Sequence, residues 1–83
     1  MQTPRPYSET VAIVVEQVAA AVQQAITESG QTVQAVARGS AVPQSTLHNK
    51  LNGGRAFTVE EIAKIARYLE VPFAALAAPS VAA

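Results

Sequence analysis

The stretch that decides the fold is residues 41–53, which read AVPQSTLHNKLNG. Its clearly apolar side chains are Val42, Leu47 and Leu51. Leu47 and Leu51 stand four residues apart, so a helix places them on one side. Pro43 suits the first position of that helix, because its missing N–H costs nothing there. The helix is expected to end at Asn52-Gly53-Gly54.

The other side of this helix is polar. At about 100° per residue, Ser45 and Asn49 point almost directly away from the leucines, and Gln44 lies in the first turn. Thr46 and His48 flank the leucines. Amide and hydroxyl groups can match the donors and acceptors that base edges present in the DNA major groove. This face therefore has the chemistry that major-groove recognition needs.

A shorter helix is predicted just before it, starting near Thr32. Its apolar positions are Val33, Val36 and Ala37, and its outward polar positions are Gln34 and Arg38. Gly39-Ser40-Ala41-Val42 interrupts the pattern. Residues 32–52 therefore predict a helix, a short turn and a second helix.

Helices are also expected on both sides of this pair. Ser8 can cap a long helix that ends near Ser29, with valines at three- and four-residue spacing and Gly30 as its terminator. Thr58 and Glu61 form a capping box for a fourth helix, which buries a stripe that includes Val59 and runs to about Leu69. A last short helix follows Val71-Pro72 to Ala78, with Phe73 and Leu76 packing inward. The expectation is an all-α, five-helix domain over residues 8–78, with a flexible arm at 1–7 and a tail at 79–83.

Charge is unevenly distributed in a chain whose net charge is zero. The acids are Glu9, Glu16, Glu28, Glu60, Glu61 and Glu70, so none lies between residues 30 and 59. That window contains Arg38, Lys50 and Arg55, together with His48. A locally basic surface of this kind attracts phosphate even when the whole chain is neutral.

Several other functions are disfavoured by composition. The 83 residues suit one small domain, and the chain has no cysteine for a disulfide or thiolate site. One histidine without neighbouring acids predicts no metal, and we expect no cofactor or small-molecule ligand. The sequence contains no nucleophile–base pair and no phosphate-binding loop, so we do not expect an enzyme. The absence of a membrane-length apolar segment or signal peptide favours a cytoplasmic location.

These elements, in this order and spacing, resemble the lambda-repressor/Cro-type (Xre-like) helix-turn-helix family. The likeness covers residues 32–78 and rests on a small residue in the first helix, on Gln44-Ser45-Thr46-Leu47, on Leu51-Asn52-Gly53 and on the capped helix after Phe57. The resemblance implies base contacts from Gln44, Ser45, Thr46, His48 and Asn49. It implies phosphate contacts from Thr32, Gln34, Arg38, Lys50, Asn52, Gly53 and Arg55, with Arg5 as an arm contact.

Two positions depart from the family pattern. Ala41 occupies a turn position where the family often has glycine, and a positive φ there would cost roughly 1 kcal/mol relative to glycine. Pro43 replaces the Ser or Thr that often caps the recognition helix, so a side-chain cap bond is not expected. Both positions bear on how this helix enters the groove.

The resulting hypothesis is a sequence-specific repressor of double-stranded DNA, similar to a small phage Cro or immunity repressor. A homodimer is expected, at least on DNA, because half-sites usually carry two-fold symmetry. Ile13 on the long first helix is a candidate dimer contact. Two alternatives stay open: an antitoxin that represses its own operon, and a protein-interaction module that has lost DNA binding.

Overall fold

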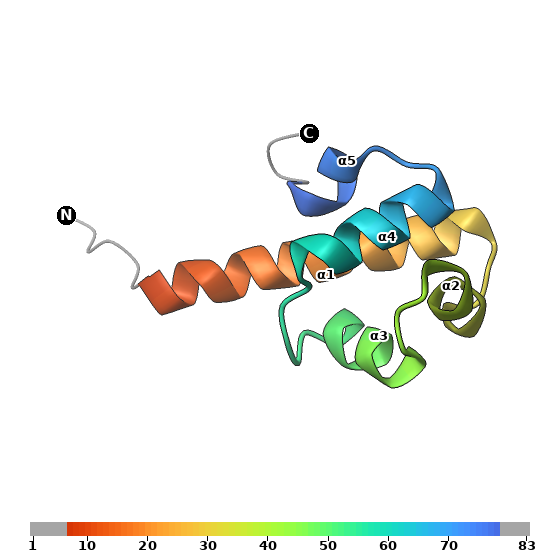
Figure 1. Ribbon diagram of the computed structural model, residues 1–83. Helices are drawn as coiled ribbons and strands as arrows, with labels where there is room; N and C mark the ends of the chain where they lie inside the picture. The colour runs from red at the N-terminus through yellow and green to blue at the C-terminus, as the bar shows by residue number, and fades with distance from the viewer. Residues whose placement is uncertain (1–6, 79–83) are drawn as a thin grey trace.

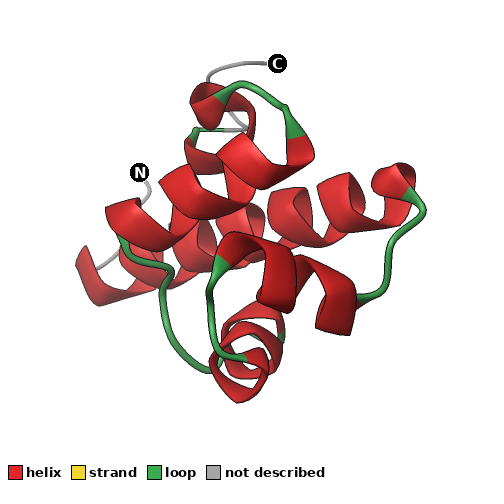
Figure 2. Cartoon of the chain, turned by 45° about the vertical axis from the view of Figure 1, so that its right-hand side comes forward, coloured by secondary structure: helices red, strands yellow, loops and turns green. Residues whose placement is uncertain are grey.

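The computed structural model describes residues 7–78, with side chains from residue 11 onward. Five α-helices follow one another: α1 (Tyr7–Ser29), α2 (Val33–Ser40), α3 (Gln44–Leu51), α4 (Val59–Leu69) and α5 (Phe73–Ala77) (Figure 1). No strand occurs in this range (Figure 2), so the all-α prediction is confirmed. Arg5, the rest of residues 1–6 and the predicted tail at 79–83 lie outside the described residues.

Helix α1 is the longest element, with 23 residues and therefore a length of about 35 Å. Its second half enters the core through Val22 and Ile26, whereas its first half projects beyond the other helices (Figure 1). The prediction that Ser8 caps it is wrong by one or two residues, because Tyr7 is already helical. None of the described helices is long and apolar enough to cross a membrane.

The turn between α2 and α3 has a positive φ at Ala41, the conformation that is unfavourable for alanine. Ala41 adopts the left-handed region at φ 62°, ψ 32°, and Val42 donates its N–H to the Ala37 carbonyl at 3.1 Å. Pro43 is the N-cap of α3 and not its first helical residue, because its ψ of 139° is extended. Its carbonyl accepts the Leu47 N–H at 2.9 Å, and no side chain caps the helix. The expected loss of the cap bond is thus confirmed.

Helix α4 starts with the predicted capping box, in which Thr58 and Glu61 each bond the other's backbone N–H. Two inward predictions are wrong. Val59 is 75% exposed and Phe73 is 42% exposed. Each is the first residue of its helix, so its side chain lies at the edge of the packed layer and not inside it.

All five helices contribute to one core. Its largest fully buried side chains are Val22, Ile26, Val36, Leu47, Ile65 and Leu76. At the edge of this core a small residue, Gly39, allows α2 to approach α4 closely. A Cβ on Gly39 would lie 2.1 Å from the Tyr68 ring, whose hydroxyl donates a hydrogen bond to Gln31. Tyr68 therefore links α4 to α2 and to the loop before α2.

Candidate nucleic-acid interface

Helix α3 has two unlike sides, as its sequence predicts. Leu47 is fully buried and holds the helix against the core. Gln44, Ser45, His48 and Asn49 are all exposed on the helix surface. Thr46, which the resemblance also made a base contact, is only half-exposed. The structure thus brings four of the five predicted base-contact residues to the solvent on one short helix.

Asn49 is held by a residue that the sequence analysis did not single out. Gly54 donates its N–H to the Asn49 carbonyl at 2.9 Å. A Cβ on Gly54 would lie 2.1 Å from the Asn49 side-chain oxygen, so the carboxamide rests directly on the Gly54 backbone. The sequence offered one sign of this contact, the second glycine of Asn52-Gly53-Gly54. The left-handed conformation at Gly53 (φ 80°) explains the first glycine but not the second.

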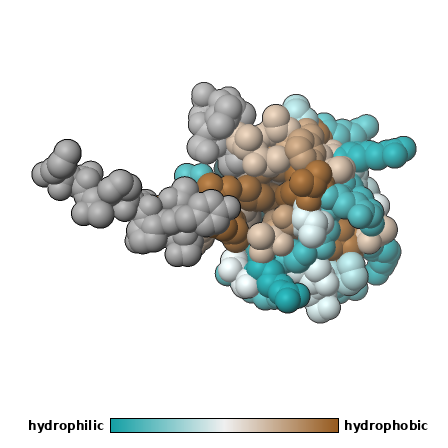
Figure 3. Space-filling view, turned by 60° about the vertical axis from the view of Figure 1, so that its left-hand side comes forward, coloured by the Kyte–Doolittle hydropathy of each residue, from teal (hydrophilic) through white to brown (hydrophobic). Residues whose placement is uncertain are grey.

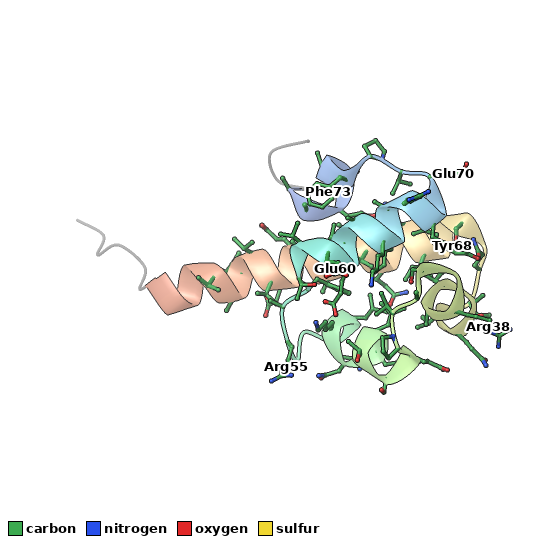
Figure 4. The ribbon with its side chains drawn as sticks, viewed as in Figure 1. Arg38, Arg55, Glu60, Tyr68, Glu70 and Phe73 are labelled. Carbon is green, nitrogen blue, oxygen red and sulfur yellow. The ribbon has the colours of Figure 1, made fainter. Side chains whose placement is uncertain are left out.

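Two arginines flank α3. Arg38 lies on α2 and Arg55 on the loop after α3, and in Figure 4 they lie on opposite sides of the helix. Both are exposed, and neither forms an ion pair with any residue of the described range. Their guanidinium groups can therefore reach phosphates on either side of a groove that α3 would enter.

A shallow hollow lies at the helix-turn-helix junction. It is lined by Gln34, Ala37, Arg38, Ala41, Val42, Pro43 and Gln44. Polar groups from α2 and from the first turn of α3 therefore share one concave surface. Such a hollow suits a phosphate oxygen, since it combines a guanidinium with amide donors.

The remaining predicted phosphate contacts lie at the ends of the two helices. Thr32 caps α2, and its hydroxyl accepts the Ala35 N–H at 3.1 Å, which leaves the hydroxyl hydrogen as a donor. Gln34 is exposed in the first turn of α2. Asn52 and Gly53 are exposed where α3 ends. All four positions are therefore accessible to solvent.

Lys50 does not occupy the position predicted for it. Its side chain is only 10% exposed, and its ammonium lies 2.5 Å from the Glu61 carboxylate on α4. The structure therefore argues against the predicted phosphate contact at Lys50, because the charge is already paired and turned away from solvent. The basic surface of residues 30–59 consequently depends on Arg38 and Arg55.

The pair with Lys50 also affects the pKa of Glu61. Partial burial raises the pKa of its carboxyl, but hydrogen bonds from Lys50 and from the backbone and hydroxyl of Thr58 act in the opposite direction and prevail. The pKa of Glu61 therefore lies below its ordinary value, and the carboxylate is charged at neutral pH.

Comparison with known proteins assigns the chain to a family. No curated protein and no solved structure matches the chain. The model of the BetR domain matches residues 9–81, which is most of the chain and includes α2 to α5 and all of α1 except its first two residues. BetR domains are small, helical and similar to helix-turn-helix domains, which agrees with α2, its turn and α3. The match does not single out the Cro-like type that the sequence suggested. The chain belongs to the BetR domain family.

Proposed function

We propose that this protein is a sequence-specific regulator that binds double-stranded DNA with α3 in the major groove and represses by occupying its operator. The observation that carries this proposal is the division of α3 into a buried side at Leu47 and an exposed side with Gln44, Ser45 and Asn49. Membership of a helix-turn-helix-like family supports it.

Base recognition would come from the amides. A carboxamide can donate and accept hydrogen bonds in one plane, which suits the N6 and N7 edge of adenine. Gln44 is in the first turn of α3 and Asn49 near its end, so they would contact different base pairs. Ser45 and His48 lie between them and can add single hydrogen bonds.

Electrostatics favour the same side of the molecule. Arg38 and Arg55 flank α3, whereas the acids of the described residues belong to α1, to α4 and, in Glu70, to the residue that follows α4. Glu61 is paired with Lys50 of α3, and Glu16 of α1 lines a hollow together with Asn52 and Gly53 at the end of that helix. A DNA backbone that follows α3 would therefore meet two cations, and near Asn52 it would also approach the Glu16 carboxylate.

A second copy of the chain is the partner we propose on DNA, because repressor half-sites are usually related by two-fold symmetry. Ile13, which the sequence analysis suggested as a contact, is half-buried. Val11 and Val14 are more accessible, at 40% and 48% exposed. Figure 3 shows hydrophobic atoms gathered in the middle of the face that it displays.

Selection from random duplex DNA tests the proposal. We expect an enriched sequence and, on that sequence, two chains per palindrome by sedimentation. Gln44→Ala and Asn49→Ala should each weaken binding to the selected site by about 1–3 kcal/mol and relax specificity, while random DNA is bound as before. Gln24→Ala, an exposed glutamine on α1, is the matched control and should change nothing. A failure to enrich any sequence would instead favour the interaction-module alternative.

A further inference from the structure

We propose that Glu61 is a positioning residue for the recognition helix: it holds Lys50 and thereby sets the angle at which α3 presents its polar face. This inference rests on the proposed DNA-binding function. Its starting point is one oxygen atom. Oε1 of Glu61 accepts the backbone N–H of Thr58 at 2.9 Å and the ammonium of Lys50 at 2.5 Å. The atom that caps α4 is thus also the atom that holds α3.

The pair is buried enough to impose a geometry. The Lys50 side chain is 10% exposed and that of Glu61 is 18% exposed. Lysine is rarely buried without a partner, because an unpaired ammonium loses its hydration. By contrast, the ion pair between Lys64 and Glu60 on the surface of α4 is longer, at 3.2 Å, and its side chains are 43% and 77% exposed. An exposed pair of that kind contributes little to structure.

The place of Lys50 on α3 explains what the pair controls. The helix has eight residues and is about 12 Å long, so movement of one end rotates its whole outer face. Leu47 anchors its middle in the core, and α3 packs mainly against α1 and α2. Lys50 lies in the last turn and provides a separate connection to α4. Two anchors at different points along α3 fix its tilt.

A fixed tilt matters for base recognition more than for phosphate binding. Hydrogen bonds to base edges require the donor and acceptor in a narrow range of positions, whereas phosphate contacts tolerate more movement. Loss of the pair should therefore reduce the ratio of specific to random DNA binding. It should leave the salt dependence unchanged, since Lys50 does not contact phosphate.

The experiment compares Lys50→Met, Glu61→Gln and the double variant with Lys64→Met as the matched control. Affinity for the selected site and for random duplex is measured at several salt concentrations. We expect the specificity ratio to fall about tenfold in both single variants and no further in the double variant. Lys64→Met should keep the ratio. An unchanged ratio in Lys50→Met, or additive losses in the double variant, would overturn the proposal. A salt slope lower by about one in Lys50→Met would show instead that Lys50 contacts phosphate.

A second measurement separates this proposal from the proposed function. Amide chemical shifts of free protein should move along residues 44–51 in Lys50→Met and stay in place in Lys64→Met. Glutamine can still cap α4, so Glu61→Gln provides the same test if Lys50→Met does not fold. If the wild-type protein binds no duplex, the proposed function fails. If the α3 amide shifts do not move in the variants, positioning by Glu61 is refuted, whether or not the protein binds DNA.

Discussion

Replacing Ala41 by glycine should stabilise the protein. Ala41 has φ 62° and ψ 32°, where the Cβ of an L-residue approaches the following carbonyl oxygen. That conformation costs about 1–2 kcal/mol for a residue with a Cβ, and glycine removes the cost. Glycine is also freer in the unfolded chain, which takes back about 0.5–1 kcal/mol. The free energy of unfolding should therefore rise by about 0.5–1 kcal/mol, since the exposed Ala41 methyl group contributes little burial.

Urea unfolding followed by circular dichroism measures this change, and the melting temperature should rise by about 4 °C. Ala63→Gly is the matched control, because Ala63 is also exposed but lies inside α4. There the same substitution should lower the free energy of unfolding by about 1 kcal/mol. If Ala41→Gly destabilised the protein as much as Ala63→Gly does, the left-handed turn at Ala41 would be refuted.

Three further predictions concern packing, charge and association. Gly39→Ala should lower the free energy of unfolding by about 1–3 kcal/mol in chemical denaturation, because the new methyl group would overlap the Tyr68 ring; a neutral effect would mean that the ring can move. Because the pKa of Glu61 is lowered in the folded protein, its carboxylate stabilises the fold at pH values above the unfolded pKa of about 4.3, and this stability is lost as the pH falls through the folded pKa. The difference in the free energy of unfolding between wild type and Glu61→Gln should therefore shrink below about pH 4 in acid titrations. Val14→Glu should reduce dimer formation on the selected DNA in sedimentation runs, whereas Val59→Glu, at a valine that is still more accessible, should leave it intact.

The sequence predicts most of this fold because its local signals are independent and agree. The capping box at Thr58 and Glu61 depends on contacts three residues apart, and the two-sided character of α3 depends on leucines four apart. The cost at Ala41 could be anticipated as well, since a turn of this length often needs a residue with positive φ. Such features can be inferred because the residues involved are close in the chain.

What could not be predicted depends on residues that meet only in the folded molecule. A charge count treats Lys50 as a surface cation, and nothing near it in sequence says otherwise. Its partner Glu61 stands eleven residues later and already had a role as a helix cap. A carboxylate oxygen can accept more than one hydrogen bond, so the capping role did not exclude a second partner. The contact of Asn49 with Gly54 also requires the loop after α3 to fold back, and the second glycine was only an indirect sign of it.

The corrected charge distribution makes a quantitative prediction about DNA binding. Each phosphate neutralised by a basic side chain contributes about −0.9 to the slope of log affinity against log salt. Arg38 and Arg55 together should therefore contribute about −1.8, and Lys50 nothing, because its ammonium is paired. The double variant Arg38→Gln with Arg55→Gln should lower the measured slope by that amount on random duplex DNA. Arg67→Gln, an exposed arginine on α4, should not change it. A slope that stays the same in the double variant would remove both arginines from the interface, and phosphate binding would then have to come from the backbone N–H groups at the start of α2.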